Sequence, residues 1–264
     1  ALKRIKDLKS IKDHLLPAFS DDEMKELKKL EEFEKAIKRE GDNCFSYKEY
    51  KLPEPRFEAC VFLDRCGVEN LDNPEYFRDK DIIDAGAFIG DSALIFSELT
   101  NGKVYSFEPT GENYESLLKT IELNGLKNVE ACNYALGAEK GTADMTNAIV
   151  SSTNSYVEKS RMPYTATESV KVIRLDDFVR KHGLNVGLIK TDVEGAEQLL
   201  LKGAMETIKS QRPTLLISIY HNTSDFYDIK PMLEGLDLGY TFKIRHPAIG
   251  TVLMETMLIA EVKN

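Results

Sequence analysis

The chain of 264 residues contains no tryptophan and has a deficit of positive charge. Its 35 lysines and arginines stand against 44 aspartates and glutamates, which gives a net charge of −9. Because a nucleic-acid backbone requires a basic face, a nucleic-acid partner is not expected. No apolar run approaches the roughly 18–20 residues of a membrane-spanning helix, so neither a membrane span nor a signal peptide is predicted.

Cysteine is scarce as well, and no pair has the C-x-x-C spacing typical of zinc sites or redox centres. We therefore expect reduced thiols in a cytoplasmic protein. The 16 glycines and 9 prolines form no repeat or low-complexity segment. With 42% hydrophobic residues, a chain of this length can bury one large core and a small accessory piece. The four cysteines are Cys44, Cys60, Cys66 and Cys132.

The first 52 residues have the periodicity of helices. Apolar residues recur at helical spacing over residues 2–16, with basic residues between them, until Pro17 ends the pattern, and a second stripe runs over residues 24–37. We expect an N-terminal helical extension over residues 1–52, followed by a main domain over residues 53–264. The main domain or a second copy of the chain, in a homodimer, can cover the apolar faces. A membrane surface is an alternative for the basic first helix.

The most informative stretch is a strand, a turn and a helix. An apolar strand over residues 81–84 ends at Asp84, the chain turns over Gly86 and Gly90, and a helix is predicted from Asp91. A second strand then ends at Glu108. This order is typical of the nucleoside-binding half of a doubly wound α/β fold. The glycines let the backbone pass close to a bound group, and the Glu108 carboxylate can accept hydrogen bonds from both hydroxyls of a ribose.

The spacing of the glycines indicates which nucleoside is bound. A dinucleotide fingerprint needs G-x-G-x-x-G, whereas this turn has G-x-x-x-G. Asp84 and Asp91 flank the place that a pyrophosphate would occupy, and their charges repel phosphate and favour a cation. S-adenosylmethionine fits, because it has an adenosine, a sulfonium and an ammonium but no phosphate. A nicotinamide-dependent oxidoreductase is disfavoured for the same reasons.

Five further strands are predicted in the second half of the domain. Residues 145–170 are rich in serine, threonine and asparagine without an apolar period, so we expect a long loop that acts as a lid or binds substrate. A solvated insertion without a role is the alternative. Ser224 is expected to cap the helix that follows the strand over residues 214–220. The strands cover residues 128–135, a segment ending at Asp192, residues 214–220 before His221, residues 240–245, and an antiparallel strand over residues 252–261 after a loop with His246.

Five ordered blocks in residues 73–261 resemble the FkbM-type S-adenosylmethionine-dependent methyltransferases. The resemblance implies a Rossmann-like class I methyltransferase fold, a seven-stranded and mostly parallel α/β sheet with helices on both faces. It also implies methylation of a hydroxyl on a carbohydrate, glycolipid or polyketide-like acceptor. A nitrogen acceptor, or a cofactor-binding protein without activity, is the alternative. The blocks are residues 84–91, residues 107–109 with Asn113, residues 135–137, residues 175–178 and residues 189–197.

The turn and the strand ends provide the expected cofactor site. Gly86 and Gly90 would approach the methionine moiety, Asp84 and Asp91 would attract its ammonium, and Glu108 would hold the ribose. The simpler interpretations are a helix cap for Asp91 and a carboxylate satisfied by backbone for Asp84. The residues expected to contact S-adenosylmethionine are Asp84, Gly86, Ala87, Phe88, Gly90, Asp91, Glu108, Pro109, Asn113, Ala135 and Asp192.

The ends of two other strands provide the expected catalytic residues. Ligands of open α/β sheets bind beyond the carboxyl ends of the strands, which brings Asp192, Glu194 and His221 toward the reactive methyl group. An alkyl hydroxyl needs a base, and His221, whose ordinary pKa is ~6.5, is the first candidate. Asp192 would orient the reacting groups, and Glu194 would assist or only cap the next helix. A divalent cation held by the three residues is a second mechanism, although no metal is required by the leading one.

Overall fold

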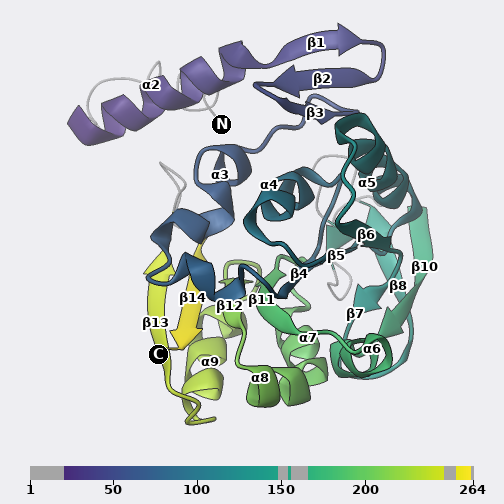
Figure 1. The fold of residues 1–264 in the computed structure, drawn as a ribbon, viewed down its shortest axis with the longest axis vertical. Helices are drawn as coiled ribbons and strands as arrows, with labels where there is room; N and C mark the ends of the chain where they lie inside the picture. The colour runs from purple at the N-terminus through teal and green to yellow at the C-terminus, as the bar shows by residue number, and fades with distance from the viewer. Residues whose placement is uncertain (1–20, 148–153, 156–165, 247–253, 263–264) are drawn as a thin grey trace.

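A computed structural model describes residues 21–147, 154–155, 166–246 and 254–262 of the chain. The helix predicted over residues 2–16 lies outside these residues. The centre of the molecule is one seven-stranded sheet with helices on either side (Figure 1). Within the described part of the chain, no helix is both long and apolar enough to cross a membrane. All four cysteines are free thiols, as predicted.

The central sheet confirms the predicted seven-stranded, mostly parallel arrangement. Its strands follow the order β13-β14-β12-β11-β4-β5-β6, and only β14 runs antiparallel to its neighbours. The strands are β4 (Asp81–Ala85), β5 (Val104–Phe107), β6 (Val129–Cys132), β11 (Val186–Thr191), β12 (Thr214–Ser218), β13 (Tyr240–Arg245) and β14 (Met257–Val262).

Side-chain alternation along the strands builds two cores, one on each face of the sheet. Ile82 and Leu188 pack with α3 and α4, whereas Ile83 and Ile189 pack with α6 to α9 on the opposite face. Strands buried on both faces need continuous apolar sequence, which is what made them visible in the sequence. The helices are α3 (Ala59–Phe62), α4 (Asp91–Leu99), α5 (Gly111–Asn124), α6 (Leu175–His182), α7 (Glu197–Gly203), α8 (Met205–Gln211), α9 (Thr223–Glu234) and the short 3₁₀ helices η1 (Arg65–Asn70) and η2 (Pro74–Phe77).

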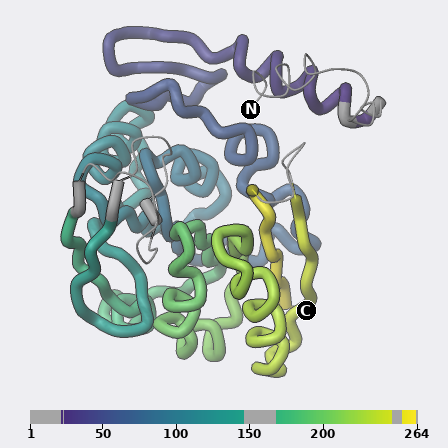
Figure 2. Tube along the Cα trace, turned by 180° about the vertical axis from the view of Figure 1, so that it is seen from behind, coloured from purple at the N-terminus to yellow at the C-terminus, as the bar shows by residue number. Residues whose placement is uncertain are grey.

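The N-terminal extension is only partly helical, so the prediction of a wholly helical segment is wrong for residues 38–52. After α2 (Asp21–Ala36) the chain forms an antiparallel sheet of β1 (Lys38–Gly41), β2 (Cys44–Tyr47) and β3 (Tyr50–Leu52), which lies across one end of the molecule (Figures 1 and 2). In β3, buried Tyr50 and Leu52 flank exposed Lys51, and this period of two requires a strand.

A second, smaller sheet corrects the prediction of a loop at residues 145–147, 154–155 and 166–170, while the rest of the predicted loop lies outside the described residues. Its order is β7-β10-β8-β9, and β8 and β10 pair antiparallel over seven positions, from Gly141 opposite Val172 to Asn147 opposite Ala166. These polar strands lack an apolar period in sequence, although Met145 and Val170 are buried. The strands are β7 (Ala135–Leu136), β8 (Gly141–Asn147), β9 (Asn154–Ser155) and β10 (Ala166–Ile173).

Two boundaries also differ from the prediction. The strand predicted over residues 128–135 ends at Cys132, and Ala135 belongs to the second sheet. Helix α9 begins at Thr223 with Asn222 at its N-cap, so Ser224 is not the cap. The Asn222 side chain instead donates hydrogen bonds to the Gly195 carbonyl oxygen and to Asp225, both at 3.0 Å. The loop after β11 and the start of α9 are thereby tied together.

Candidate functional site

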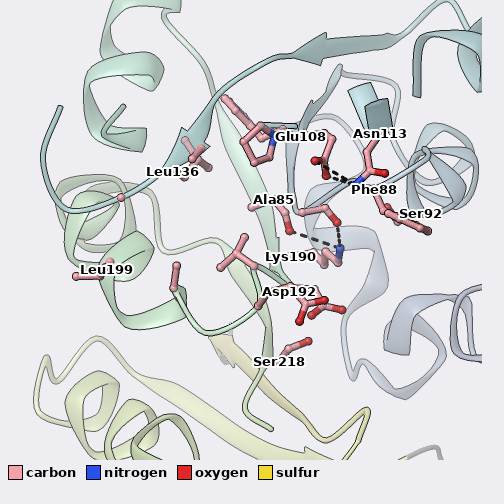
Figure 3. A pocket seen from close by; sticks show the side chains of 18 of the residues that line it. Ala85, Phe88, Ser92, Glu108, Asn113, Leu136, Lys190, Asp192, Leu199 and Ser218 are labelled. Carbon is pink, nitrogen blue, oxygen red and sulfur yellow. Dashed lines mark hydrogen bonds between the residues drawn. The ribbon is translucent and has the colours of Figure 1, made fainter. Parts of the chain in front are cut away.

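A cavity of 630 Å³ opens beyond the carboxyl ends of the parallel strands, where the sequence predicted a ligand. The turns that follow β4, β5 and β11 form one side of it, and residues near β7 and β8 form another (Figure 3). Eight of the eleven expected cofactor residues line it, whereas Asp84, Ala87 and Gly90 are buried behind its wall. The eight are Gly86, Phe88, Asp91, Glu108, Pro109, Asn113, Ala135 and Asp192.

The turn between β4 and α4 depends on glycine at its first position. Gly86 has a φ of +76°, and a Cβ atom there would lie 1.8 Å from the carbonyl oxygen of Asp192. The backbone N–H groups of Gly86 and Ala87 both donate to the carbonyl oxygen of Phe107, each at 3.0 Å. The turn is therefore held between the ends of β5 and β11, and only glycine fits.

Glu108 is fixed by hydrogen bonds at the end of β5. Its Oε2 accepts from the backbone N–H of Phe88 at 3.1 Å, and its Oε1 accepts from the backbone N–H and hydroxyl of Thr110, at 3.0 and 2.7 Å. Burial raises the pKa of Glu108, and these hydrogen bonds oppose the rise. An ionised carboxylate has about four acceptor positions. Nδ2 of Asn113 also donates to Oε1 at 3.5 Å, so one acceptor position, on Oε2, stays open.

Lys190 compensates the charge of Asp84 inside the protein. The two residues are partners in the register of β11 and β4, and Nζ of Lys190 lies 3.4 Å from Oδ1 of Asp84. The same ammonium donates to the carbonyl oxygen of Gly86 at 2.8 Å. Oδ2 of Asp84 accepts hydrogen bonds from the hydroxyls of Ser92 and Ser106, at 2.8 and 3.3 Å. Asp84 thus holds the turn together from behind.

Asp91 differs from Asp84, whose Oδ1 also accepts no hydrogen bond but is paired with Lys190, because Asp91 forms no ion pair with a described residue. Its Oδ1 accepts from the backbone N–H of Ser92 at 2.9 Å, but its buried Oδ2 accepts no hydrogen bond from any described residue. Burial raises the pKa of Asp91 to about 7, against the opposing charge of Lys190. Asp91 lines the cavity, so this oxygen is available to a donor on a bound ligand.

The expected catalytic residues form one cluster, in which His221 lies between carboxylates. Its Nδ1 is 2.9 Å from Oε1 of Glu197, and its Nε2 is 3.4 Å from Oδ1 of Asp192 and 3.3 Å from Oε2 of Glu194. Asp192 and Glu194 line the cavity, whereas the His221 ring, with 9% of its side chain exposed, lies behind them. Tyr220 donates to Oδ1 of Asp192 at 3.3 Å.

The charges around His221 alter its chemistry. Burial alone would lower its pKa, but the carboxylates of Glu194, Glu197 and Asp192 raise it to about 11. An imidazole with this pKa is protonated at neutral pH and is poorly matched to the task of a base. Burial also raises the pKa of Glu194. His246, by contrast, contacts the hydroxyl of Thr256 at 2.9 Å and does not line the cavity.

Sequence reasoning gave no role to two residues that shape the site, Lys190 and Glu197. Both lie in the block of residues 189–197 that carries the family resemblance. The available signal was a lysine inside an otherwise apolar parallel strand, since a buried charge requires a partner. Glu58 and Glu255 were also not predicted; they line the cavity, and burial, with Asp91 and Glu255 nearby, raises the pKa of Glu58 to about 8.

Comparisons with known proteins find similar methyltransferases. Methyltransferase 1 of Beauveria bassiana strain ARSEF 2860 is 25% identical over 207 residues, which cover 71% of this chain and 81% of that protein. Methyltransferase sdnD of Sordaria araneosa is 28% identical over 235 residues, which cover 76% and 87%. The crystal structure of a methyltransferase FkbM from Methylobacillus flagellatus KT superposes with a TM-score of 0.53 at 22% identity, over 69% of this chain and 43% of that one.

The family model of the methyltransferase FkbM domain matches residues 84–242, which are more than half of the chain. The match begins at Asp84, the last but one residue of β4, and ends in β13. It contains the turn around Gly86, Glu108 and the cluster around His221. The chain therefore belongs to the FkbM methyltransferase family.

Proposed function

We propose that the protein transfers a methyl group from S-adenosylmethionine to a hydroxyl of a carbohydrate, glycolipid or polyketide-like acceptor. The observation that carries the proposal is the pair of acidic residues in one cavity, Glu108 and Asp91. Oε2 of Glu108 has one open acceptor position for a ribose hydroxyl, and Oδ2 of Asp91 has no donor within the described residues. A ligand with a ribose and an ammonium, and without phosphate, satisfies both.

The charge balance of the cavity supports a cationic ligand. The ammonium of Lys190 is paired with Asp84 and donates a hydrogen bond to the Gly86 carbonyl oxygen, so its charge is already compensated at the turn. Asp91 and Asp192 both face the cavity beside it. When bound there, S-adenosylmethionine supplies a sulfonium that activates its methyl group. The protein's own contribution is alignment of the acceptor oxygen with that methyl group, an effect worth up to ~7–11 kcal/mol.

The acceptor's proton goes to a carboxylate in this proposal. As the new C–O bond forms and the S–C bond breaks, the hydroxyl proton passes to Asp192 or Glu194, which line the cavity. Burial favours the protonated form of Glu194, which suits a proton acceptor. His221, already ionised between these carboxylates and Glu197, acts as a positioning residue. This assignment replaces the expectation that the imidazole itself is the base.

A hydroxylated acceptor is supported by the polar groups on the wall of the cavity. Glu58, Arg245, Glu255 and the hydroxyl-bearing Tyr220 line it together with Asp192. Such groups can donate to and accept from the several hydroxyls of a carbohydrate. The usual acceptors implied by the family resemblance point the same way.

Two measurements test the proposal in sequence. Calorimetry with S-adenosylmethionine establishes cofactor binding, and methyl transfer from the labelled cofactor is then measured with deoxysugars, nucleotide sugars, glycolipids and polyketide-like alcohols. We expect labelled product with at least one hydroxyl acceptor, and an amine panel serves as the matched control. Binding without product on any hydroxyl, combined with product on an amine, would refute the hydroxyl assignment.

A further inference from the structure

The turn that brings Glu194 to the cavity has an unusual backbone. The N–H of Ala196 donates to the carbonyl oxygen of Val193 at 3.3 Å, so residues 193–196 form a tight turn. Its two central residues have positive φ, +55° at Glu194 and +99° at Gly195. Such values are typical of a type I′ turn, in which asparagine, aspartate or glycine usually takes the first of these positions. A glutamate there strains the backbone, so neighbouring groups must hold the turn.

Glu197, the first residue of α7, holds this turn with one oxygen. Its Oε1 accepts a hydrogen bond from the backbone N–H of Val193 at 3.0 Å, and it lies 2.9 Å from Nδ1 of His221. The opposite edge of the ring places Nε2 3.3 Å from Oε2 of Glu194 and 3.4 Å from Oδ1 of Asp192. One carboxylate therefore fixes both the backbone of the turn and the imidazolium that faces the carboxylates of the cavity.

The charge of Glu197 serves His221 rather than a ligand. The Glu197 side chain has an exposure of 0% and does not line the cavity. Among the described residues, His221 is the cation that forms an ion pair with it. A buried carboxylate is costly unless it is paired, so the two charges depend on each other. A glutamine would accept the hydrogen bond of Val193 equally well, which indicates that the negative charge has its own purpose.

Glu197 also differs from the other acidic groups around the imidazole. It makes the shortest ion-pair contact with the ring, and it is the carboxylate that does not line the cavity. Removal of its charge therefore alters His221 without removing a contact to a ligand. The titratable groups that lie around the ring are Asp192 and Glu194 after β11, Glu197 on α7, Tyr220 after β12 and Glu255 before β14.

We propose that Glu197 is a positioning residue, which holds the His221 ring in place and thereby directs Asp192 and Glu194 toward the acceptor. This inference rests on the proposed function, in which one of these two carboxylates takes the proton of the acceptor hydroxyl. Glu197 touches neither ligand, and its contribution is the alignment of the groups that do.

The first test is an NMR titration of His221 in the untagged full chain, without cofactor or acceptor. The chain has four histidines, and the signal of His221 is the one that disappears in His221→Ala. In the parent protein this imidazole should stay protonated beyond about pH 9, because the surrounding carboxylates raise its pKa to about 11. Glu197→Gln should raise the acid dissociation constant of His221 at least about tenfold. An unchanged titration would overturn the proposal.

Turnover is the second readout, measured with a hydroxyl acceptor on which the parent protein forms labelled product. Glu197→Gln should lower kcat at least about tenfold and leave the affinity for S-adenosylmethionine within about twofold, because Glu197 does not line the cavity. The loss of turnover at alkaline pH should begin at a lower pH than in the parent, where His221 now releases its proton. Turnover like that of the parent, together with a shifted titration, contradicts the positioning role.

Asp176→Asn is the matched control. The Asp176 carboxylate also has an exposure of 0%, and it accepts hydrogen bonds from the backbone N–H groups of Glu206 and Thr207 in α8, at 3.1 and 2.8 Å. It does not line the cavity. The control should lose stability in urea as Glu197→Gln does, while the titration of His221 and the pH dependence of turnover stay unchanged. If the control shifts both, the effect of Glu197 is merely structural and the proposal fails.

The outcomes also separate this proposal from the proposed function. Thermal unfolding checks each variant, and if Glu197→Gln does not fold, Glu197→Asp decides, because it keeps the charge on a shorter side chain. That variant should lower kcat at least about tenfold with the affinity for S-adenosylmethionine retained, and unchanged kcat would overturn the proposal. The proposed function is decided on the parent protein alone, whereas the titration of His221 needs neither ligand.

Discussion

Asp91 provides a test of how the cavity recognises the amino-acid part of its cofactor. Burial raises the pKa of this carboxyl to about 7, and the charge of Lys190 and the N–H of Ser92 only partly offset the rise. The carboxyl must be ionised to bind an ammonium group. Affinity for S-adenosylmethionine should therefore be weak below pH 7 and increase as the pH rises toward and through that value.

The size of the effect follows from the ionised fraction of Asp91. With a pKa of about 7, this fraction rises from about one tenth at pH 6 to about one half at pH 7, so the association constant should rise roughly fivefold. The ligand contributes little over this range, because an α-amino group with an ordinary pKa of ~7.7–8.0 stays mostly protonated. Glu58, with a pKa of about 8, also stays mostly protonated.

Calorimetry at pH 6.0, 6.5 and 7.0 measures the slope. Asp91→Asn should bind more weakly and show almost no dependence on pH. Methylthioadenosine, which keeps the nucleoside but has no ammonium, is the matched ligand control and should bind the parent protein with the same affinity at each pH. A fivefold slope that persists in Asp91→Asn, or with methylthioadenosine, would refute the assignment of the ammonium to this carboxylate.

Four further predictions concern binding, stability, turnover and assembly. Glu108→Ala should weaken binding of S-adenosylmethionine by roughly 1.5–3 kcal/mol by calorimetry, whereas Glu115→Ala, at an exposed position on α5, should not. Gly86→Ala should lower the free energy of unfolding in urea by roughly 2 kcal/mol or more. Gly125→Ala should lower it by less, because Gly125 shares the positive φ but a Cβ atom there would have no neighbouring atom within 4 Å. His221→Ala should lower turnover about 100-fold with nearly intact cofactor affinity, because Asp192 and Glu194 lose the side chain that positions them; a rate within a few-fold of the parent contradicts this positioning role. Light scattering should find a homodimer of the full chain, and a monomer at micromolar concentration would leave only intramolecular docking of α2.

The parts of the fold that could be predicted are those in which sequence and burial coincide. β4 and α4 were visible because Ile82 and Ile83 are buried on opposite faces, and because the turn between these elements requires glycine at Gly86. The strands over residues 38–52 and the pair β8 and β10 were missed for a common reason. They are short or polar, and their pairing depends on contacts between distant segments rather than on a local apolar period.

The sequence predicted which strand-end residues lie together but not their electrostatics. The strand ends brought Asp192, Glu194 and His221 together as the topology required. The pairing of Lys190 with Asp84 depends on the register between β11 and β4, which no local pattern reveals. Likewise Glu197 reaches His221 only because the turn before α7 directs it back. Charge compensation is a property of the assembled sheet, so the roles of Asp84 and His221 could not be assigned in advance.

The aromatic packing of the N-terminal extension has a consequence for how this family diversifies. The rings of Phe33 and Tyr47 pack edge to face with centroids 4.6 Å apart and contact Phe62, and Tyr47 and Phe62 also pack with Phe57. An evolutionary loss of the extension would expose the rings of Phe57 and Phe62. Relatives that begin later should therefore carry polar residues at the positions of Phe57 and Phe62, and their acquisition of aromatic side chains should accompany acquisition of the extension.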